Sequence, residues 1–171
     1  MLLLLASARL EHGIPQAARK STAGVDREGS EDGMALSEPV VVSWKNEGLL
    51  FEGVTAHGKV DLASSSDEAG QGPTPMELLA VSLAGCTSMD VVSILVKMRQ
   101  PLEAFRVEVR GEKAEEHPKR FTSLEVVYYL TGALDEQKVR RAIELSETRY
   151  CSVAATLRPA LPITSSYVIE S

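Results

Sequence analysis

Two cysteines, Cys86 and Cys151, are the residues of this 171-residue chain whose type is best suited to redox chemistry. They lie too far apart in the sequence to form a short metal-ligand spacing. Both could be small apolar residues of a packed core, as unpaired cysteines often are. The alternative is a reactive thiol. Cys151 follows Arg149 and opens a predicted helix, and a helix N-terminus and a cation each lower a thiol pKa. Cys86 follows Gly85, whose missing side chain leaves room beside the sulfur.

Three further residues are candidates to support the thiols: Glu77, His57 and Arg149. Each also has a purely structural explanation. Glu77 completes a capping box with Thr74, His57 lies in a predicted turn, and Arg149 fits a solvated surface. Asp90 places a charge inside a mostly apolar helix, so it needs a partner such as an arginine or a backbone donor.

The element that must position the first cysteine is a long helix, predicted over residues 74–98. Thr74 can cap its first turn, Pro75 suits the first helical position, and Glu77 closes the capping box. Apolar or small residues fill almost every later position, which predicts a helix buried on all sides. The uncharged run over residues 78–89 is shorter than the roughly 20 residues of a membrane span. No transmembrane segment is therefore predicted.

Strand patterns occur on both sides of this helix, and the other helices are few and separate. That order predicts an α+β fold with largely antiparallel sheets wrapped around a long central buried helix. One copy offers little cover for such a helix, so an intertwined homodimer is predicted. The predicted strands are residues 40–44, 49–55, 59–62, 105–112, 121–130 and 161–168. Two shorter helices are also predicted, one capped by Asp135 and one that begins near Cys151. The first of these two helices has a predicted buried stripe of Val139, Ala142, Ile143 and Ser146.

Composition narrows the class of protein. Hydrophobic residues make up 44% of the chain and charged residues 25%, which are ordinary globular values. The net charge of −6 offers no basic field for phosphates, so a nucleic-acid partner is not expected. We expect neither a membrane partner nor a structural disulfide, and place the chain in the cytoplasm.

Residues 1–39 are interpreted as an N-terminal extension, flexible or arising from a start assigned too far upstream, and residues 40–171 as the domain. Residues 19–33 are rich in glycine, serine and charge, which is typical of a linker. Met34 is a second possible start, which the intact mass of the native protein would test. The apolar run after Met1 resembles part of a signal peptide, but no basic residue precedes it.

Two separated segments resemble the OsmC/Ohr family of organic hydroperoxide reductases. Residues 74–87 resemble the family's hallmark helix, with Cys86 in the matching place. Residues 151–157, followed by the strand of residues 162–163, resemble the second cysteine region. The likeness covers roughly residues 40–171 and is strongest to the OsmC-like branch.

This resemblance implies a thiol peroxidase. In that cycle a Cys86 thiolate attacks the outer peroxide oxygen, releases an alcohol and becomes a sulfenic acid. Cys151 then condenses with it to form a disulfide, and a dithiol reductant resets the pair. No metal or organic cofactor is required. Apolar surroundings would favour a small organic hydroperoxide over hydrogen peroxide.

Three positions depart from the family pattern. Met76 stands ten residues before Cys86, where family peroxidases carry Glu, and Glu77 is turned about 100° away from that position. The activating Arg of the early hairpin has no counterpart other than His57. Ser152 replaces the Pro that often follows the second cysteine. A non-enzymatic OsmC-like dimer that binds a small apolar molecule or senses oxidation through its thiols is therefore the alternative function, with a purely structural thiol pair as a third.

Overall fold

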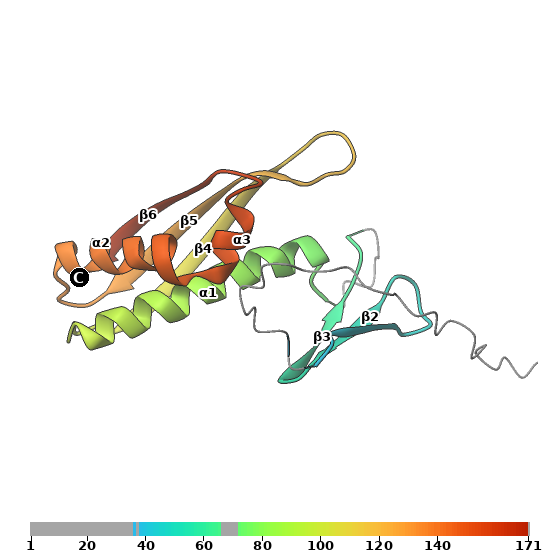
Figure 1. Cartoon of the computed structure of the whole chain (residues 1–171), viewed down its shortest axis with the longest axis horizontal. Coiled ribbons are helices and arrows are strands. Elements are labelled where there is room, and N and C mark those ends of the chain that lie inside the picture. Colours follow the sequence, from blue (N-terminus) through green and yellow to red (C-terminus); the bar gives the residue numbers. More distant parts are fainter. Residues whose placement is uncertain (1–35, 37, 66–71, 171) are drawn as a thin grey trace, which may run out of the picture. The chain divides into compact units, whose positions relative to one another are not determined.

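The computed structural model describes residues 36, 38–65 and 72–170 (Figure 1). Most of the predicted extension, including Met34, lies outside this range, so the boundary at residue 39 stays a prediction. In chain order the elements are β1 (Val41–Trp44), β2 (Phe51–Thr55), β3 (Gly58–Leu62), α1 (Pro75–Lys97), β4 (Ala104–Lys113), β5 (Phe121–Thr131), α2 (Glu136–Leu145), the π-helical turn η1 (Ser146–Tyr150), α3 (Ser152–Leu157) and β6 (Ile163–Glu170).

The first three strands form an antiparallel sheet in the order β1-β2-β3, in agreement with the predicted antiparallel pattern. The β1–β2 turn contains Asn46 and Gly48, both with positive φ angles of 61° and 45°. Asn and Gly tolerate that conformation better than other residues, which explains why the chain reverses here. Thr55 closes the β2–β3 turn, where its Oγ1 accepts a hydrogen bond from the Gly58 N–H at 3.1 Å.

The second sheet has the order β4-β5-β6 and is mixed. β4 and β5 are antiparallel, whereas β5 and β6 are parallel, with Tyr128 opposite Tyr167. The parallel pair is an exception to the predicted antiparallel pattern. It arises because α2, η1 and α3 together form a crossover between β5 and β6, as parallel neighbours require. The predicted α+β class is confirmed.

Helix α1 begins as the sequence predicts. Thr74 Oγ1 accepts a hydrogen bond from the Glu77 N–H at 3.2 Å, and Glu77 Oε2 accepts one from the Thr74 N–H at 2.7 Å. This reciprocal pair satisfies donors that the first turn of a helix leaves free. The cap fixes where α1 starts, and thereby which residues of α1 face the core.

Within one chain, burial of α1 is confined to one stripe. Leu83, Thr87, Val91 and Leu95 recur every four residues and are buried, whereas the side chain of Met89 is 71% exposed. The prediction of burial on all sides therefore does not hold for a single copy. By length and composition alone, α1 could also cross a membrane, a test that core helices of soluble proteins pass too.

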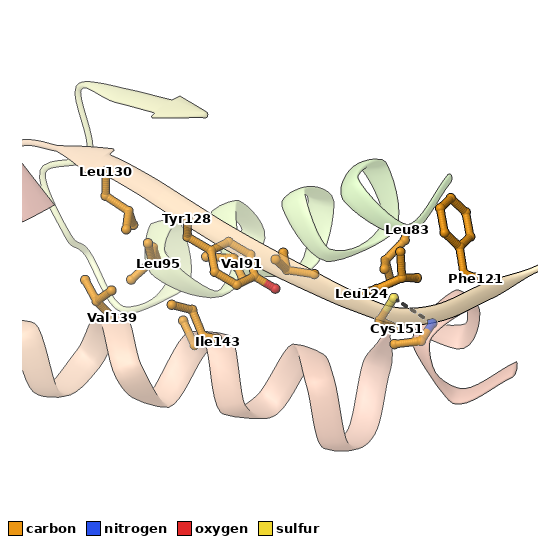
Figure 2. Close-up of a cluster of buried hydrophobic side chains, with 13 residues drawn as sticks. Leu83, Val91, Leu95, Phe121, Leu124, Tyr128, Leu130, Val139, Ile143 and Cys151 are labelled. Carbon is orange, nitrogen blue, oxygen red and sulfur yellow. Dashed lines mark hydrogen bonds between the residues drawn. The ribbon is translucent and has the colours of Figure 1, made fainter. Parts of the chain in front are cut away.

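The core lies between α1, β5 and α2 (Figure 2). Tyr128 and Leu130 of β5 are fully buried, and Figure 2 shows them among side chains of α1 and α2. Burial of a side chain of this size stabilises the fold by about 1.5–3 kcal/mol. The stripe predicted for the helix after Asp135 is buried at all four positions: Val139, Ala142 and Ile143 of α2, and Ser146 of η1.

Candidate thiol site

Cys86 lies on the half-buried face of α1. It follows Leu79 and Leu83 at helical spacing, and its side chain packs against the core cluster. A Cβ atom added to Gly85 would meet no heavy atom within 4 Å, so the helix surface next to Cys86 is open. The space that the missing side chain of Gly85 leaves is therefore not filled by another part of the described chain.

Cys151 is placed by the π-helical turn η1. Its N–H donates to the Ser146 carbonyl at 2.8 Å, a bond that spans five residues and ends the helical run. Cys151 then takes an extended conformation and becomes the N-cap of α3, where its Sγ accepts the Ala154 N–H at 3.3 Å (Figure 2). The thiol is 2% exposed. Its orientation is therefore fixed by backbone geometry on both sides.

The structure brings the two cysteines together with a carboxylate. Cys86 Sγ, Cys151 Sγ and a carboxylate oxygen of Asp90 all lie within 4.8 Å of one another. Both cysteines are free thiols. A disulfide needs sulfur atoms about 2 Å apart. A bridge between two thiols that are free in this structure therefore requires the sulfur atoms to come closer.

Burial raises the pKa of the Cys151 thiol to about 11. The adjacent Cys86 thiol acts in the same direction, while the Ala154 N–H lowers the pKa by less. The sequence-based expectation of a lowered pKa is therefore wrong for Cys151. The N-terminus of α3 does point at the sulfur, but the loss of water outweighs it.

Asp90 is the site residue that the sequence analysis did not assign to the thiol pair. Its Oδ2 accepts a hydrogen bond from Ser146 Oγ at 3.0 Å, and Ser146 is fully buried. The partner is thus a hydroxyl rather than the arginine or backbone donor that was expected. A signal was present: Asp90 follows Cys86 by one helical turn, so the two side chains share a face of α1.

The three supporting candidates have other contacts. Glu77 closes the α1 capping box, and Thr74 lowers the pKa of its carboxyl group. The His57 N–H donates to Thr55 Oγ1 at 3.2 Å in the β2–β3 turn. The Arg149 guanidinium stacks 5.6 Å from the Tyr150 ring centroid. Within the described residues, no hydrogen bond or ion pair joins any of the three candidates to the thiols.

Tyr128 brings a phenol into the core beside the site. Burial raises its pKa to about 12, and its charge interactions include Cys151 and Glu147. The neighbouring Thr87 hydroxyl donates to carbonyls of α1 at 3.1 Å. Among the described residues, no hydrogen bond of ordinary geometry satisfies Tyr128 Oη.

Comparisons with known proteins place this arrangement in a family. A family model described as OsmC-like protein matches residues 65–166. The chain belongs to the OsmC-like protein family. It is 41% identical to protein YhfA of Escherichia coli K12 over 131 residues, which cover 75% of this chain and 95% of that protein.

Solved structures agree with this assignment. A hypothetical protein from Aquifex aeolicus is 31% identical, with a TM-score of 0.72 over 80% of this chain and 98% of that one. The organic hydroperoxide resistance protein OhrB of Bacillus subtilis is 15% identical, with a TM-score of 0.55 over 76% of this chain and 96% of that one. At that identity, OhrB shows a shared fold alone.

Two cavities in this OsmC-like chain lie along the helix that carries Cys86. One of 420 Å³ is almost wholly apolar and is lined by Met76 and Leu79 of α1 together with Phe121 and Leu161. The other, of 340 Å³, is more polar, and Asp90 lines it. One cavity therefore lies beside the part of α1 that precedes Cys86 and the other beside the part that follows it, and neither cysteine lines either cavity.

Proposed function

We propose that this OsmC-like chain is a thiol-dependent peroxidase that reduces organic hydroperoxides to alcohols. The observation that carries the proposal is the approach of Cys86 Sγ and Cys151 Sγ to within 4.8 Å. Two free thiols at that separation can exchange between dithiol and disulfide without unfolding of either helix. The family match and the redox-related names of structural relatives support the same class of chemistry.

The cycle assigns a different step to each thiol. The Cys86 thiolate attacks the outer oxygen of ROOH, the O–O bond breaks, and the alkoxide takes up a proton to leave as ROH. The resulting Cys86 sulfenic acid condenses with the Cys151 thiol, which forms the S–S bond and releases water. A dithiol then reduces the disulfide and is itself oxidised. We place this cycle in the cytoplasm, where thiol reductants are abundant.

The apolar cavity supports an organic rather than an inorganic peroxide. Leu79 lies seven residues before Cys86, which is about 10 Å along the same helix face. The apolar part of a substrate can lie against Met76 and Leu79, although neither cysteine is among the residues that line this cavity. Met76, at the position where family peroxidases carry Glu, adds apolar surface to this cavity.

Turnover of cumene hydroperoxide with a dithiol reductant tests the proposal. We expect Cys86→Ser to abolish turnover. Cys151→Ser should retain one equivalent of peroxide consumption per chain and leave a sulfenic acid on Cys86 that a dimedone-type reagent traps. Absence of consumption above background in the parent chain, with both thiols reduced at the start, would reject peroxidase activity.

A binding or sensing role is the second candidate function. The 420 Å³ apolar cavity supports it, because a cavity of this size accepts a small apolar molecule without any reaction. The same reduced chain should then bind cumene alcohol or a similar ligand tightly while it consumes no peroxide. Disulfide formation that is slow and stoichiometric, without turnover, would favour an oxidation sensor.

We further propose that the chain acts as a homodimer. Val81, Met89 and Val96 of α1 are 61%, 71% and 62% exposed, an unusual density of exposed apolar side chains on one helix. A second copy is the occupant that we assign to this face, because the helix that carries it also carries the thiol site. Sedimentation of the full chain tests the proposal, and a monomer at micromolar concentration would reject it.

A further inference from the structure

We propose that the reduced chain binds a zinc-type divalent cation through Cys86, Asp90 and Cys151. The three ligand atoms lie within 4.8 Å of one another. In a tetrahedral zinc site, bonds of about 2–2.3 Å place neighbouring ligand atoms roughly 3.5–3.8 Å apart. Small side-chain rotations therefore suffice to close the three ligands around an ion.

The three proposed ligands come from two neighbouring elements of the fold. Cys86 and Asp90 are one helical turn apart on α1, the spacing that lets two side chains of one helix hold the same ion. Cys151 arrives from the N-cap of α3. Two sulfurs and one oxygen in a compact arrangement favour zinc over calcium or magnesium, which prefer oxygen ligands alone. Three protein ligands leave a fourth position for water or another small ligand.

Charge supports the same conclusion. Both thiols can lose their proton to a metal ion, and within the described residues Asp90 has no ion pair with a lysine, arginine or histidine. A dication that displaces the two thiol protons converts the two thiols and the carboxylate into a complex with a net charge of about −1. The ion thus supplies a positive charge beside Asp90, which forms no salt bridge among the described residues.

Two of the three proposed ligands already accept a hydrogen bond from a neighbouring residue that is not itself a ligand. Ser146 Oγ donates to Asp90 Oδ2, and the Ala154 N–H donates to Cys151 Sγ. Such outer contacts hold ligands of metal sites in place, and their loss typically costs about 10–100-fold in affinity. Of the three ligands, Asp90 lines the cleft of 340 Å³ and is therefore the one that an ion in this cleft would meet first.

Metal binding and disulfide formation exclude each other, because the disulfide uses the same two sulfur atoms. A bound ion would therefore hold the pair reduced. Only this protective effect rests on the proposed function. The binding itself requires no turnover, so a chain that binds zinc without peroxidase activity would reject the proposed function and leave the metal site standing.

The experiment uses the full chain, reduced with a phosphine that does not compete strongly for metal. Titration with Zn²⁺ should reach one ion per chain, with release of about two protons in weak buffer. Co²⁺ should give absorption bands of thiolate-to-cobalt charge transfer. The disulfide form should bind neither ion at this site. Equal binding by the reduced and disulfide forms would overturn the proposal without any mutation.

Variants then test each ligand. Asp90→Asn keeps the shape of the side chain and the hydrogen bond with Ser146, and should weaken zinc binding at least 10-fold. Cys86→Ser and Cys151→Ser should each remove the charge-transfer bands. Asp61→Asn is the matched control, because Asp61 is an exposed aspartate of β3 that pairs with Lys45. Parent-like affinity in Asp90→Asn, with the control also unchanged, would remove Asp90 from the ligand set and reject the site as proposed.

Discussion

Asp90 lies one helical turn after Cys86, and its carboxylate is within 4.8 Å of the Cys86 sulfur. The buried Ser146 hydroxyl holds that carboxylate from the side of α2 and η1. An ion, proton donor or reagent that reaches Cys86 therefore also meets a fixed negative group.

Ser146→Ala should lower the free energy of unfolding by about 1–3 kcal/mol. The variant removes a hydrogen bond to a carboxylate and leaves Asp90 half-buried without that donor. Urea denaturation measures the change. Ser165→Ala, at an exposed serine of β6, serves as the control and should change stability by less than about 0.5 kcal/mol. Equal effects of the two substitutions would show that the Ser146–Asp90 bond contributes nothing to stability.

Cys151 should resist alkylation until the solution is strongly alkaline. Its pKa of about 11, against an ordinary value of 9.0, leaves on the order of 100-fold less thiolate below pH 9 than in the unfolded chain. Iodoacetamide labelling followed by peptide mass spectrometry measures each cysteine separately. Labelling of Cys151 at pH 8 as fast in the folded chain as in urea would contradict the burial argument.

The same shift carries a stability consequence. Because the folded state holds the Cys151 proton more tightly, the stabilisation is complete below about pH 9 and is lost as the pH rises toward about 11. Cys151→Ser should flatten this part of the stability profile. A parent profile without any fall over that window would argue against the raised pKa.

Thr74→Ala should lower the free energy of unfolding by about 1 kcal/mol, because it removes the side chain that caps α1. Thr74 also lowers the pKa of Glu77, so the carboxylate part of this cap is present near neutral pH and is lost as the pH falls below about 4.5. Thermal unfolding at pH 7 and pH 3.5 measures both effects. A Thr74→Ala penalty that is larger at pH 3.5 than at pH 7 would contradict this assignment.

Met89→Glu should convert a dimer into a monomer, because it places a charge on the exposed apolar face of α1. In a chain that is monomeric already, the same surface change should leave both the mass and the stability nearly unaltered. Sedimentation velocity distinguishes the two cases. Val168→Glu on β6, also at an exposed apolar residue, is the control and should leave the mass of the dimer unchanged.

Tyr128→Phe should leave the free energy of unfolding unchanged or raise it by up to about 1 kcal/mol. The phenol oxygen is buried without a hydrogen bond of ordinary geometry, so its removal abolishes a desolvation cost and keeps the packing of the ring. Chemical denaturation measures the difference. A loss of more than about 1 kcal/mol would mean that the hydroxyl has a partner, and the adjacent Thr87 would be the first candidate.

Most of the fold prediction rested on patterns formed by residues close together in the sequence. The start of α1 followed from a capping box, and the buried stripe of α2 followed from helical periodicity, because both depend on residues a few positions apart. The direction of β6 could not be predicted this way. It depends on how the crossover through α2 and α3 returns to the sheet, and no short pattern encodes that path.

The candidate site was also predicted only where local sequence features indicate it. The two cysteines were identified from residue type and family resemblance, and the structure places their sulfur atoms together. The role of η1 was not predicted, although this turn delivers both Ser146 and Cys151 to the site. The lowered thiol pKa was the error with a clear cause: a helix N-terminus is visible in a sequence, whereas the burial of Cys151 depends on the whole fold.

The crossover that carries Cys151 has a consequence for biosynthesis. Translation produces α1, with Cys86 on its surface, before it produces η1 and β6. While the chain emerges from the ribosome, Cys86 has no second thiol of the same chain within reach, because Cys151 is the other cysteine of the sequence and is made later. The Cys151 thiol therefore comes within reach of Cys86 only after η1 has docked against α1.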